Sequence, residues 1–187
     1  MHRLFKKSEI LTIPNILSFF RLALVPLIAW VYMGLDDYYL AIGLIVLSGL
    51  TDVIDGKIAR KYNMISDFGK ILDPIADKVT QGILIICLST RYKLMIALVA
   101  IFIIKEALML LLGYLVLKKN DSVNSAKWYG KLNTVVLYAV CVLLIMFPEM
   151  SLSIANTMII VCGALILFSF VRYVLLYRTI LKTDIKK

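Results

Sequence analysis

Charged residues are scarce in this sequence: Asp, Glu, Lys and Arg make up 18% of its 187 residues, whereas a soluble domain usually has about 25%. Hydrophobic residues account for 61%, and the mean hydropathy is +0.91. A chain of this length can bury a full core without such an excess of hydrophobic residues. The additional hydrophobic side chains must therefore face something other than water. The composition excludes a disordered protein and an ordinary cytosolic enzyme, and it indicates a polytopic membrane protein.

Cysteine is also scarce, which excludes a disulfide scaffold. The cysteines lie in apolar runs without metal-site spacing, and we expect them to pack as small hydrophobic side chains: Cys87, Cys141 and Cys162. The sequence also lacks low-complexity segments, internal repeats and a recognisable domain boundary. It therefore predicts a single domain over residues 1–187.

The N-terminal region lacks the features of a cleavable signal. Its basic start is followed by an apolar run that is too long, with no small-residue cleavage site before Asp36. We therefore expect this segment to be retained. Residues 3–10 fit either a short amphipathic helix on the inner leaflet or a basic tail.

Six segments reach the length of about 20 residues that a helix needs to cross a bilayer. They are Leu11–Gly34, Tyr38–Arg60, Asp67–Thr90, Lys93–Leu117, Tyr129–Phe147 and Ser151–Tyr177. Pro14 suits the first turn of the first helix, and Pro148 stops the fifth. The predicted fold is an all-α bundle of six transmembrane helices.

The basic residues orient this bundle. With the N-terminus inside, sixteen of the 21 Lys and Arg residues fall on cytoplasmic segments, and only Arg91 and Lys93 fall outside. Both termini are therefore expected to be cytoplasmic. The net charge of +9 fits contact with anionic lipid headgroups better than nucleic acid.

Four acidic residues gather at the predicted inner ends of the second and third helices. Asp52 and Asp55 are spaced i,i+3, and Asp73 and Asp77 are spaced i,i+4, so each pair shares a helix face. We expect the two helices to be antiparallel neighbours whose carboxylates converge. Such an all-oxygen cluster suits Mg²⁺, Mn²⁺ or Ca²⁺, although salt bridges to nearby lysines are the plainer alternative.

Other residue types beside the cluster favour a phosphate ligand. Gly56 and Gly69 leave the backbone accessible to a bulky group. Arg60 lies one turn further along and is a natural partner for a phosphate. Together with a metal, these residues indicate a diphosphate site at the membrane surface.

The spacing D-x2-D-G-x2-A-R-x8-G-x3-D-x3-D resembles the signature of the CDP-alcohol phosphatidyltransferase family, and all eight of its positions are present between Asp52 and Asp77. The resemblance implies transfer of a phosphatidyl group from a CDP-alcohol, usually CDP-diacylglycerol, to an acceptor hydroxyl, with release of CMP. It also implies two Mg²⁺ or Mn²⁺ ions on the four carboxylates and a homodimer. By the same resemblance Asp77 is the catalytic base, and the CDP pocket includes Asp52, Gly56, Ala59, Arg60 and Gly69.

Segments outside this motif bear on the acceptor. The opening I-P-N-x2-S-x2-R-x4-P of the first helix resembles phosphatidylglycerophosphate synthases and cardiolipin synthases of this family. We assign Asn15 to the nucleotide pocket. Asn15, Ser18 and Arg21 form one polar stripe that should face the bundle interior, where Arg21 either pairs with an acidic residue or contacts a ligand.

Three lysines are candidates for the phosphate of glycerol 3-phosphate: Lys105, Lys127 and Lys131. Pairing with Glu106 is the alternative for Lys105, and a positive-inside anchor is the alternative for Lys131. The Lys105-Glu106 pair departs from the arginine-acidic pair usual in phosphatidylglycerophosphate synthases. The run Gly130-Lys131-Leu132-Asn133-Thr134 is also similar to the S-K-x-N-T run of cardiolipin synthases, whose acceptor is phosphatidylglycerol.

The sequence thus predicts an integral membrane enzyme, expected in a bacterial cell membrane, with its active site on the cytoplasmic face. It would use CDP-diacylglycerol and glycerol 3-phosphate, or phosphatidylglycerol as the alternative acceptor. A small cation transporter is the rival from another class. The acidic residues lie at helix ends beside Arg60 and not at mid-span, which favours the enzyme.

Overall fold

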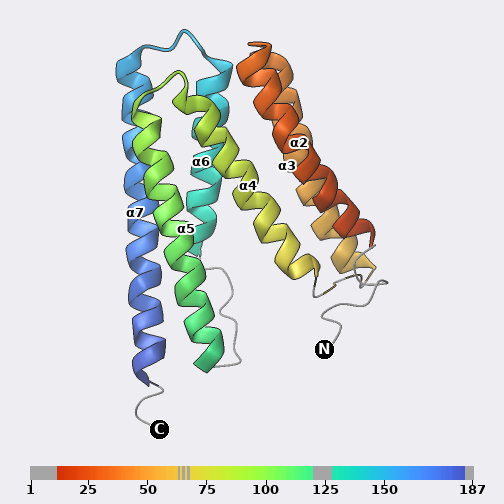
Figure 1. Ribbon diagram of the computed structural model, residues 1–187, viewed down its shortest axis with the longest axis vertical. Helices are drawn as coiled ribbons and strands as arrows, with labels where there is room; N and C mark the ends of the chain where they lie inside the picture. The colour runs from red at the N-terminus through yellow and green to blue at the C-terminus, as the bar shows by residue number, and fades with distance from the viewer. Residues whose placement is uncertain (1–11, 63, 65, 67, 120–127, 184–187) are drawn as a thin grey trace. The chain divides into compact units, whose positions relative to one another are not determined.

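The computed structural model describes residues 12–62, 64, 66, 68–119 and 128–183, and every regular element within them is a helix (Figure 1). The helices are α2 (Ile13–Gly34), α3 (Tyr38–Lys61), α4 (Gly69–Ser89), α5 (Leu94–Lys119), α6 (Trp128–Met146) and α7 (Leu152–Thr183). The all-α prediction is confirmed. The helix considered for residues 3–10 lies outside the described residues.

The helix ends follow the predicted signals closely. Pro14 occupies the first turn of α2, where a missing N–H costs nothing. Pro148 comes two residues after α6 ends at Met146. α7 runs six residues beyond the predicted Tyr177, as far as Thr183.

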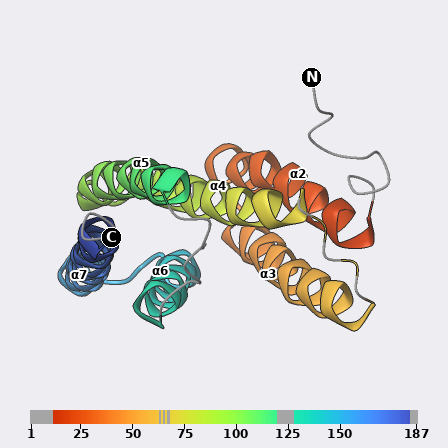
Figure 2. The same ribbon diagram turned by 90° about the horizontal axis from the view of Figure 1, so that it is seen from below.

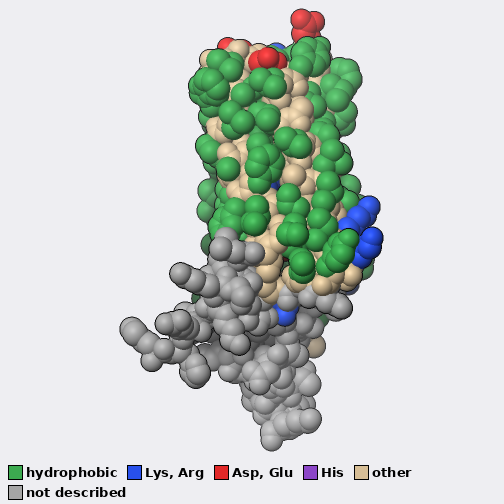
Figure 3. Space-filling view, turned by 90° about the vertical axis from the view of Figure 1, so that its right-hand side faces the viewer, with side chains coloured by type: hydrophobic (Ala, Val, Ile, Leu, Met, Phe, Trp, Pro, Cys, Tyr) green, Lys and Arg blue, Asp and Glu red, His purple; other side chains and the backbone are tan. Residues whose placement is uncertain are grey.

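Five of the six helices in the described residues are long and apolar enough to cross a membrane. The exception is α4, because its first half contains Lys70, Asp73, Asp77 and Lys78. Its crossing stays a prediction. Figure 3 shows hydrophobic side chains covering the outer face of α2 and α3, with acidic side chains at one end and basic ones towards the other. The chain is a polytopic helical membrane bundle.

The helices group into two units, Met1–Thr90 and Arg91–Lys187. In the first, α2 packs against both α3 and α4. Its buried apolar side chains recur at helical spacing after the polar stripe: Leu24, Val25, Ile28, Val31 and Tyr32. Figure 2 views this unit from the end at which α3 finishes and α4 begins. α2 is therefore the central helix of the unit.

In the second unit α7 has the corresponding place, because both α5 and α6 pack against it. Its core side chains include Met95 and Leu98 from α5, Leu137 from α6, and Ile159 and Ile166 from α7. The cysteines of both units are buried and form no disulfide bond, as predicted: Cys87, Cys141 and Cys162.

Candidate active site

The guanidinium of Arg21 lies among three of the four clustered carboxylates. Its Nη2 is 2.7 Å from Asp52 Oδ1 and 2.6 Å from Asp55 Oδ2. Its Nη1 donates to Asp77 Oδ1 at 2.6 Å. One buried arginine of α2 therefore joins carboxylates from α3 and α4.

Ser18, one turn earlier on α2, brings in the fourth carboxylate. Its hydroxyl lies 2.6 Å from Asp73 Oδ1 and 3.4 Å from Asp55 Oδ2. The predicted convergence of the four acidic side chains is thus present. α3 and α4 run antiparallel, as predicted, but both helices pack mainly on α2, whose polar stripe bridges their carboxylates (Figure 1).

Charge and exposure vary across this carboxylate cluster (Asp52, Asp55, Asp73 and Asp77). The side chain of Asp55 is 5% exposed, whereas those of Asp52 and Asp77 are 45% and 38% exposed. Arg21 contacts three of the four carboxylates and Lys78 also acts on Asp77, which still leaves negative charge in excess at a partly buried place. Such an excess is costly unless protons or cations compensate it.

No three Asp, Glu, His or Cys side chains in the described part of the chain are grouped closely enough to hold a metal ion as they stand. In the cluster, the guanidinium of Arg21 lies among the carboxylates. The donor chemistry nevertheless fits a hard divalent cation, because every donor is a carboxylate oxygen and negative charge is in excess. The partial exposure of Asp52 and Asp77 leaves them accessible to a ligand.

Asn15 and Gly69 lie together where the segment before α4 meets α2. The Asn15 amide donates to Ser66 Oγ at 3.0 Å, and the backbone N–H of Gly69 donates to the same hydroxyl at 2.9 Å. Asn15, Ser66 and Gly69 are all buried. Asn15 therefore has a structural role at the start of α4, separate from its predicted role in nucleotide binding.

The remaining residues predicted for CDP lie on the last turns of α3. Arg60 is exposed and donates from Nε to the carbonyl of Gly56 at 2.9 Å. Gly56 and Ala59 share a face of α3 with Asp52 and Asp55, since these positions are spaced at i, i+3, i+4 and i+7. The motif residues of α3 therefore form one continuous strip.

Gly69 is the glycine of this unit that most clearly requires the absence of a side chain. A Cβ there would lie 2.6 Å from Asn15 Oδ1 and 3.0 Å from Ser66 Oγ. Gly69→Ala is expected to lower the free energy of unfolding by about 1–3 kcal/mol, as overpacking usually does.

Thermal unfolding in detergent measures this effect. Gly49→Ala is the matched control, because a Cβ at Gly49 meets nothing within 4 Å, and alanine is the better helix former by up to about 1 kcal/mol. Equal melting temperatures for the two variants would contradict the close approach at Gly69.

The residues predicted for the acceptor belong to the second unit. Lys105 is buried, and its ammonium lies 2.6 Å from Glu106 Oε1, so the pairing considered from the sequence is present. Lys131 is exposed in the first turns of α6. Lys127 lies outside the described residues.

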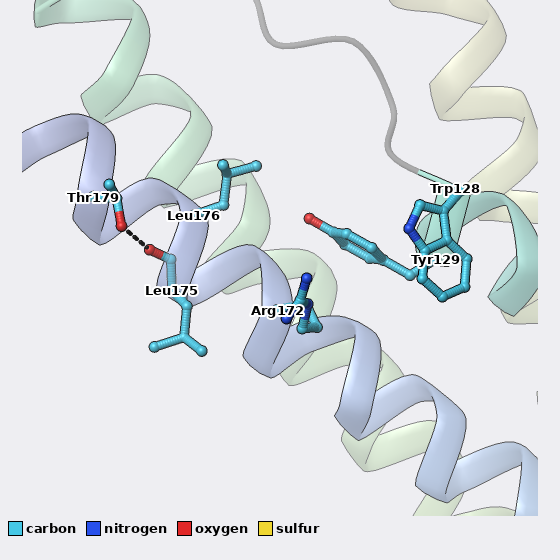
Figure 4. A pocket seen from close by; sticks show the side chains of 6 residues that line it. All are labelled: Trp128, Tyr129, Arg172, Leu175, Leu176 and Thr179. Atoms are coloured by element: carbon cyan, nitrogen blue, oxygen red, sulfur yellow. Dashed lines mark hydrogen bonds between the residues drawn. The ribbon is translucent and has the colours of Figure 1, made fainter.

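A pocket of about 380 Å³ opens between the start of α6 and the later turns of α7 (Figure 4). Its lining consists of Trp128, Tyr129, Arg172, Leu175, Leu176 and Thr179. The Arg172 guanidinium carbon lies 5.9 Å from the centre of the Tyr129 ring. Arg172 is one of the sixteen basic residues that fall on the segments predicted to be cytoplasmic.

The family model described as CDP-alcohol phosphatidyltransferase matches residues 11–180, which include both units. The chain belongs to this family. The resemblance inferred from the Asp52–Asp77 motif is thereby confirmed, and the transporter hypothesis is not supported. Members of the family generally depend on a divalent metal.

Relatives of this phosphatidyltransferase carry two different names. A cardiolipin synthase (CMP-forming) of Streptomyces coelicolor is 34% identical over 74% of this chain and 67% of its own length. A chloroplastic CDP-diacylglycerol–glycerol-3-phosphate 3-phosphatidyltransferase of rice is 37% identical over 65% of this chain and 36% of its own. The Rickettsia bellii enzyme with that activity in its name is 45% identical over 41% and 43%. The chain spans less than half the length of most curated relatives it matches.

Two residues of the phosphatidyltransferase motif region have contacts that sequence reasoning did not assign. Ser18 was recognised only as part of the polar stripe, and its spacing from Arg21 was the signal that it faces the same neighbours. Ser66 gave no such signal, because it precedes α4 and has no helical register.

Proposed function

We propose that the protein transfers the phosphatidyl group of CDP-diacylglycerol to a hydroxyl of glycerol 3-phosphate, giving phosphatidylglycerol phosphate and CMP. The observation that carries this proposal is the convergence of the four family-motif carboxylates on the polar stripe of α2. That arrangement concentrates negative charge beside exposed Arg60, within a chain whose outer surface suits a lipid-bound donor.

Asp52, Asp55, Asp73 and Asp77 would hold two Mg²⁺ or Mn²⁺ ions. When bound, such a pair neutralises the diphosphate, polarises the phosphorus and stabilises the leaving CMP. Ser18 and Arg21 hold one oxygen of each carboxylate in the contacts described above.

The reaction forms one bond to phosphorus and breaks another. The acceptor oxygen attacks the phosphatidyl phosphorus, and the diphosphate bridge breaks so that CMP leaves with the bridging oxygen. Asp77 takes the proton of the acceptor hydroxyl, a role that its 38% exposed side chain supports. Arg60 would bind the diphosphate, and Asn15, Asp52, Gly56, Ala59 and Gly69 would surround the CDP group.

Lysine side chains of the second unit would bind the phosphate of the acceptor. Exposed Lys131 is the strongest candidate, and Lys105 and Lys127 complete the proposed set. Lys105 already pairs with Glu106, so its contribution requires that a phosphate compete with that carboxylate.

Phosphatidylglycerol is the second candidate acceptor. The relative from Streptomyces coelicolor is named a cardiolipin synthase. Among the relatives described above, its match covers the largest share of both chains. The Lys131-Leu132-Asn133-Thr134 run is compatible with either acceptor.

The proposed setting is a bacterial cell membrane, with both termini and the carboxylate cluster on the cytoplasmic side and the enzyme as a homodimer. The excess of basic residues on the segments assigned to that side supports this orientation. A water-soluble acceptor and a membrane-bound donor would then meet at headgroup level.

Product analysis separates these possibilities. Purified protein is incubated with CDP-diacylglycerol and Mn²⁺, with either glycerol 3-phosphate or phosphatidylglycerol, and CMP and the lipid products are identified by mass spectrometry. We expect phosphatidylglycerol phosphate from the first acceptor. Cardiolipin from the second acceptor alone would select the second candidate, and absence of CMP with both would contradict the enzyme proposal.

A further inference from the structure

Arg21 is the least exposed charged side chain of the described residues, at 1% exposure. Its two terminal nitrogens contact one oxygen each of Asp52, Asp55 and Asp77, while its Nε is buried and has no hydrogen-bond partner among the described residues. The guanidinium therefore lies where the carboxylates converge, and it forms ion pairs with three of them.

The guanidinium occupies the place among the carboxylates that a bound cation would take. It draws carboxylates from two helices onto a third, and like charges this close would otherwise repel. The oxygens that it contacts, Asp52 Oδ1, Asp55 Oδ2 and Asp77 Oδ1, are chemically the donors that a hard divalent ion prefers. Ser18, which carries no charge, holds Asp73 by a hydrogen bond alone.

We propose that Arg21 is the built-in counter-cation of the carboxylate cluster: it holds the cluster together in the metal-free protein and weakens the binding of divalent cations to it. This inference rests on the proposed metal site. The fixed positive charge of Arg21 would repel a divalent ion held by the same carboxylates. The divalent ion must also compete for carboxylate oxygens that Arg21 already contacts. The enzyme thereby keeps three helices assembled without metal, at the cost of affinity for it.

The first test is Mn²⁺ binding without substrate, followed by the electron paramagnetic resonance signal of free Mn²⁺. Removing one positive charge at contact distance should tighten Mn²⁺ binding by about tenfold or more in Arg21→Gln. Lys57→Gln is the matched control, since it removes the same charge from an exposed position of α3, and screening should keep its effect below about threefold. Unchanged or weaker Mn²⁺ binding in Arg21→Gln would overturn the proposal.

The second test needs neither metal nor activity. In EDTA, Arg21→Gln should lower the melting temperature by about 10 °C, because the buried carboxylate of Asp55 and the partly exposed ones of Asp52 and Asp77 lose their partner. Mn²⁺ should then raise the melting temperature of this variant more than that of the wild type. An equal or smaller rise in the variant would contradict the counter-cation role.

A double variant covers the case in which Arg21→Gln does not fold. Adding Asp52→Asn removes one of the repelling charges, so the double variant should be recovered folded and melt above the single variant in EDTA. Failure of the double variant to improve on the single one would overturn the proposal. Wild-type protein that binds no Mn²⁺ would overturn the proposed metal site, whereas the comparison in EDTA decides the role of Arg21 separately.

Discussion

Asp77→Asn is expected to slow CMP release by about 10²–10⁴-fold, the usual contribution of a general base. Asparagine keeps the shape of the side chain and an oxygen for Arg21 Nη1, which lies 2.6 Å from Asp77 Oδ1. It cannot accept the proton of the acceptor hydroxyl. Binding of CDP-diacylglycerol should therefore remain while turnover is lost.

Steady-state CMP release measures the loss of turnover. Equilibrium binding of CDP-diacylglycerol measures whether donor binding remains. Asp36→Asn is the matched control, because Asp36 lies in the connection between α2 and α3, at the end of these helices away from the cluster. Its φ of 52° is one that asparagine also adopts readily. Turnover of Asp77→Asn within about tenfold of wild type would remove Asp77 from the base role.

Removal of divalent cations is expected to reduce CMP release to background. Three of the four cluster carboxylates face a single guanidinium, so their negative charge would repel a diphosphate unless further cations compensate it. Activity should be lost in EDTA and return on addition of Mg²⁺ or Mn²⁺. Na⁺ at equal ionic strength should not restore it, because screening alone does not supply the divalent cation that would neutralise the diphosphate.

The structure supplies an internal control for this chelation experiment. Because Arg21 holds the cluster without metal, EDTA-treated wild type should stay folded, with a melting temperature within a few degrees of the loaded protein. Loss of activity should thus be reversible. Full activity in EDTA would contradict the metal-dependent mechanism, and irreversible unfolding in EDTA would contradict the stabilising role of Arg21.

Periodicity in the sequence was sufficient to predict the helices and the composition of the cluster. Asp52 with Asp55, and Asp73 with Asp77, share faces because helical spacing alone determines this. Pro14 and Pro148 mark helix boundaries because proline lacks an N–H. The polar stripe of Asn15, Ser18 and Arg21 was expected to face inward, and all three side chains are buried.

Which helices are neighbours could not be predicted in the same way. Spacing shows that two carboxylates share a face, but it does not show that α2 bridges α3 and α4. For Arg21 the sequence left a carboxylate pair and a ligand contact equally open, and only three-dimensional distances show the three ion pairs. The hydrogen bond between Asn15 and Ser66 joins residues 51 positions apart and has no local signal.

The central claim is that the carboxylate cluster around Arg21 is the metal centre of a phosphatidyltransferase. Anomalous X-ray scattering from Mn²⁺ in crystals of active protein tests it most directly. We expect Mn²⁺ peaks at coordination distance from carboxylate oxygens of Asp52, Asp55, Asp73 and Asp77. Mn²⁺ bound only elsewhere, in protein that still releases CMP, would contradict it.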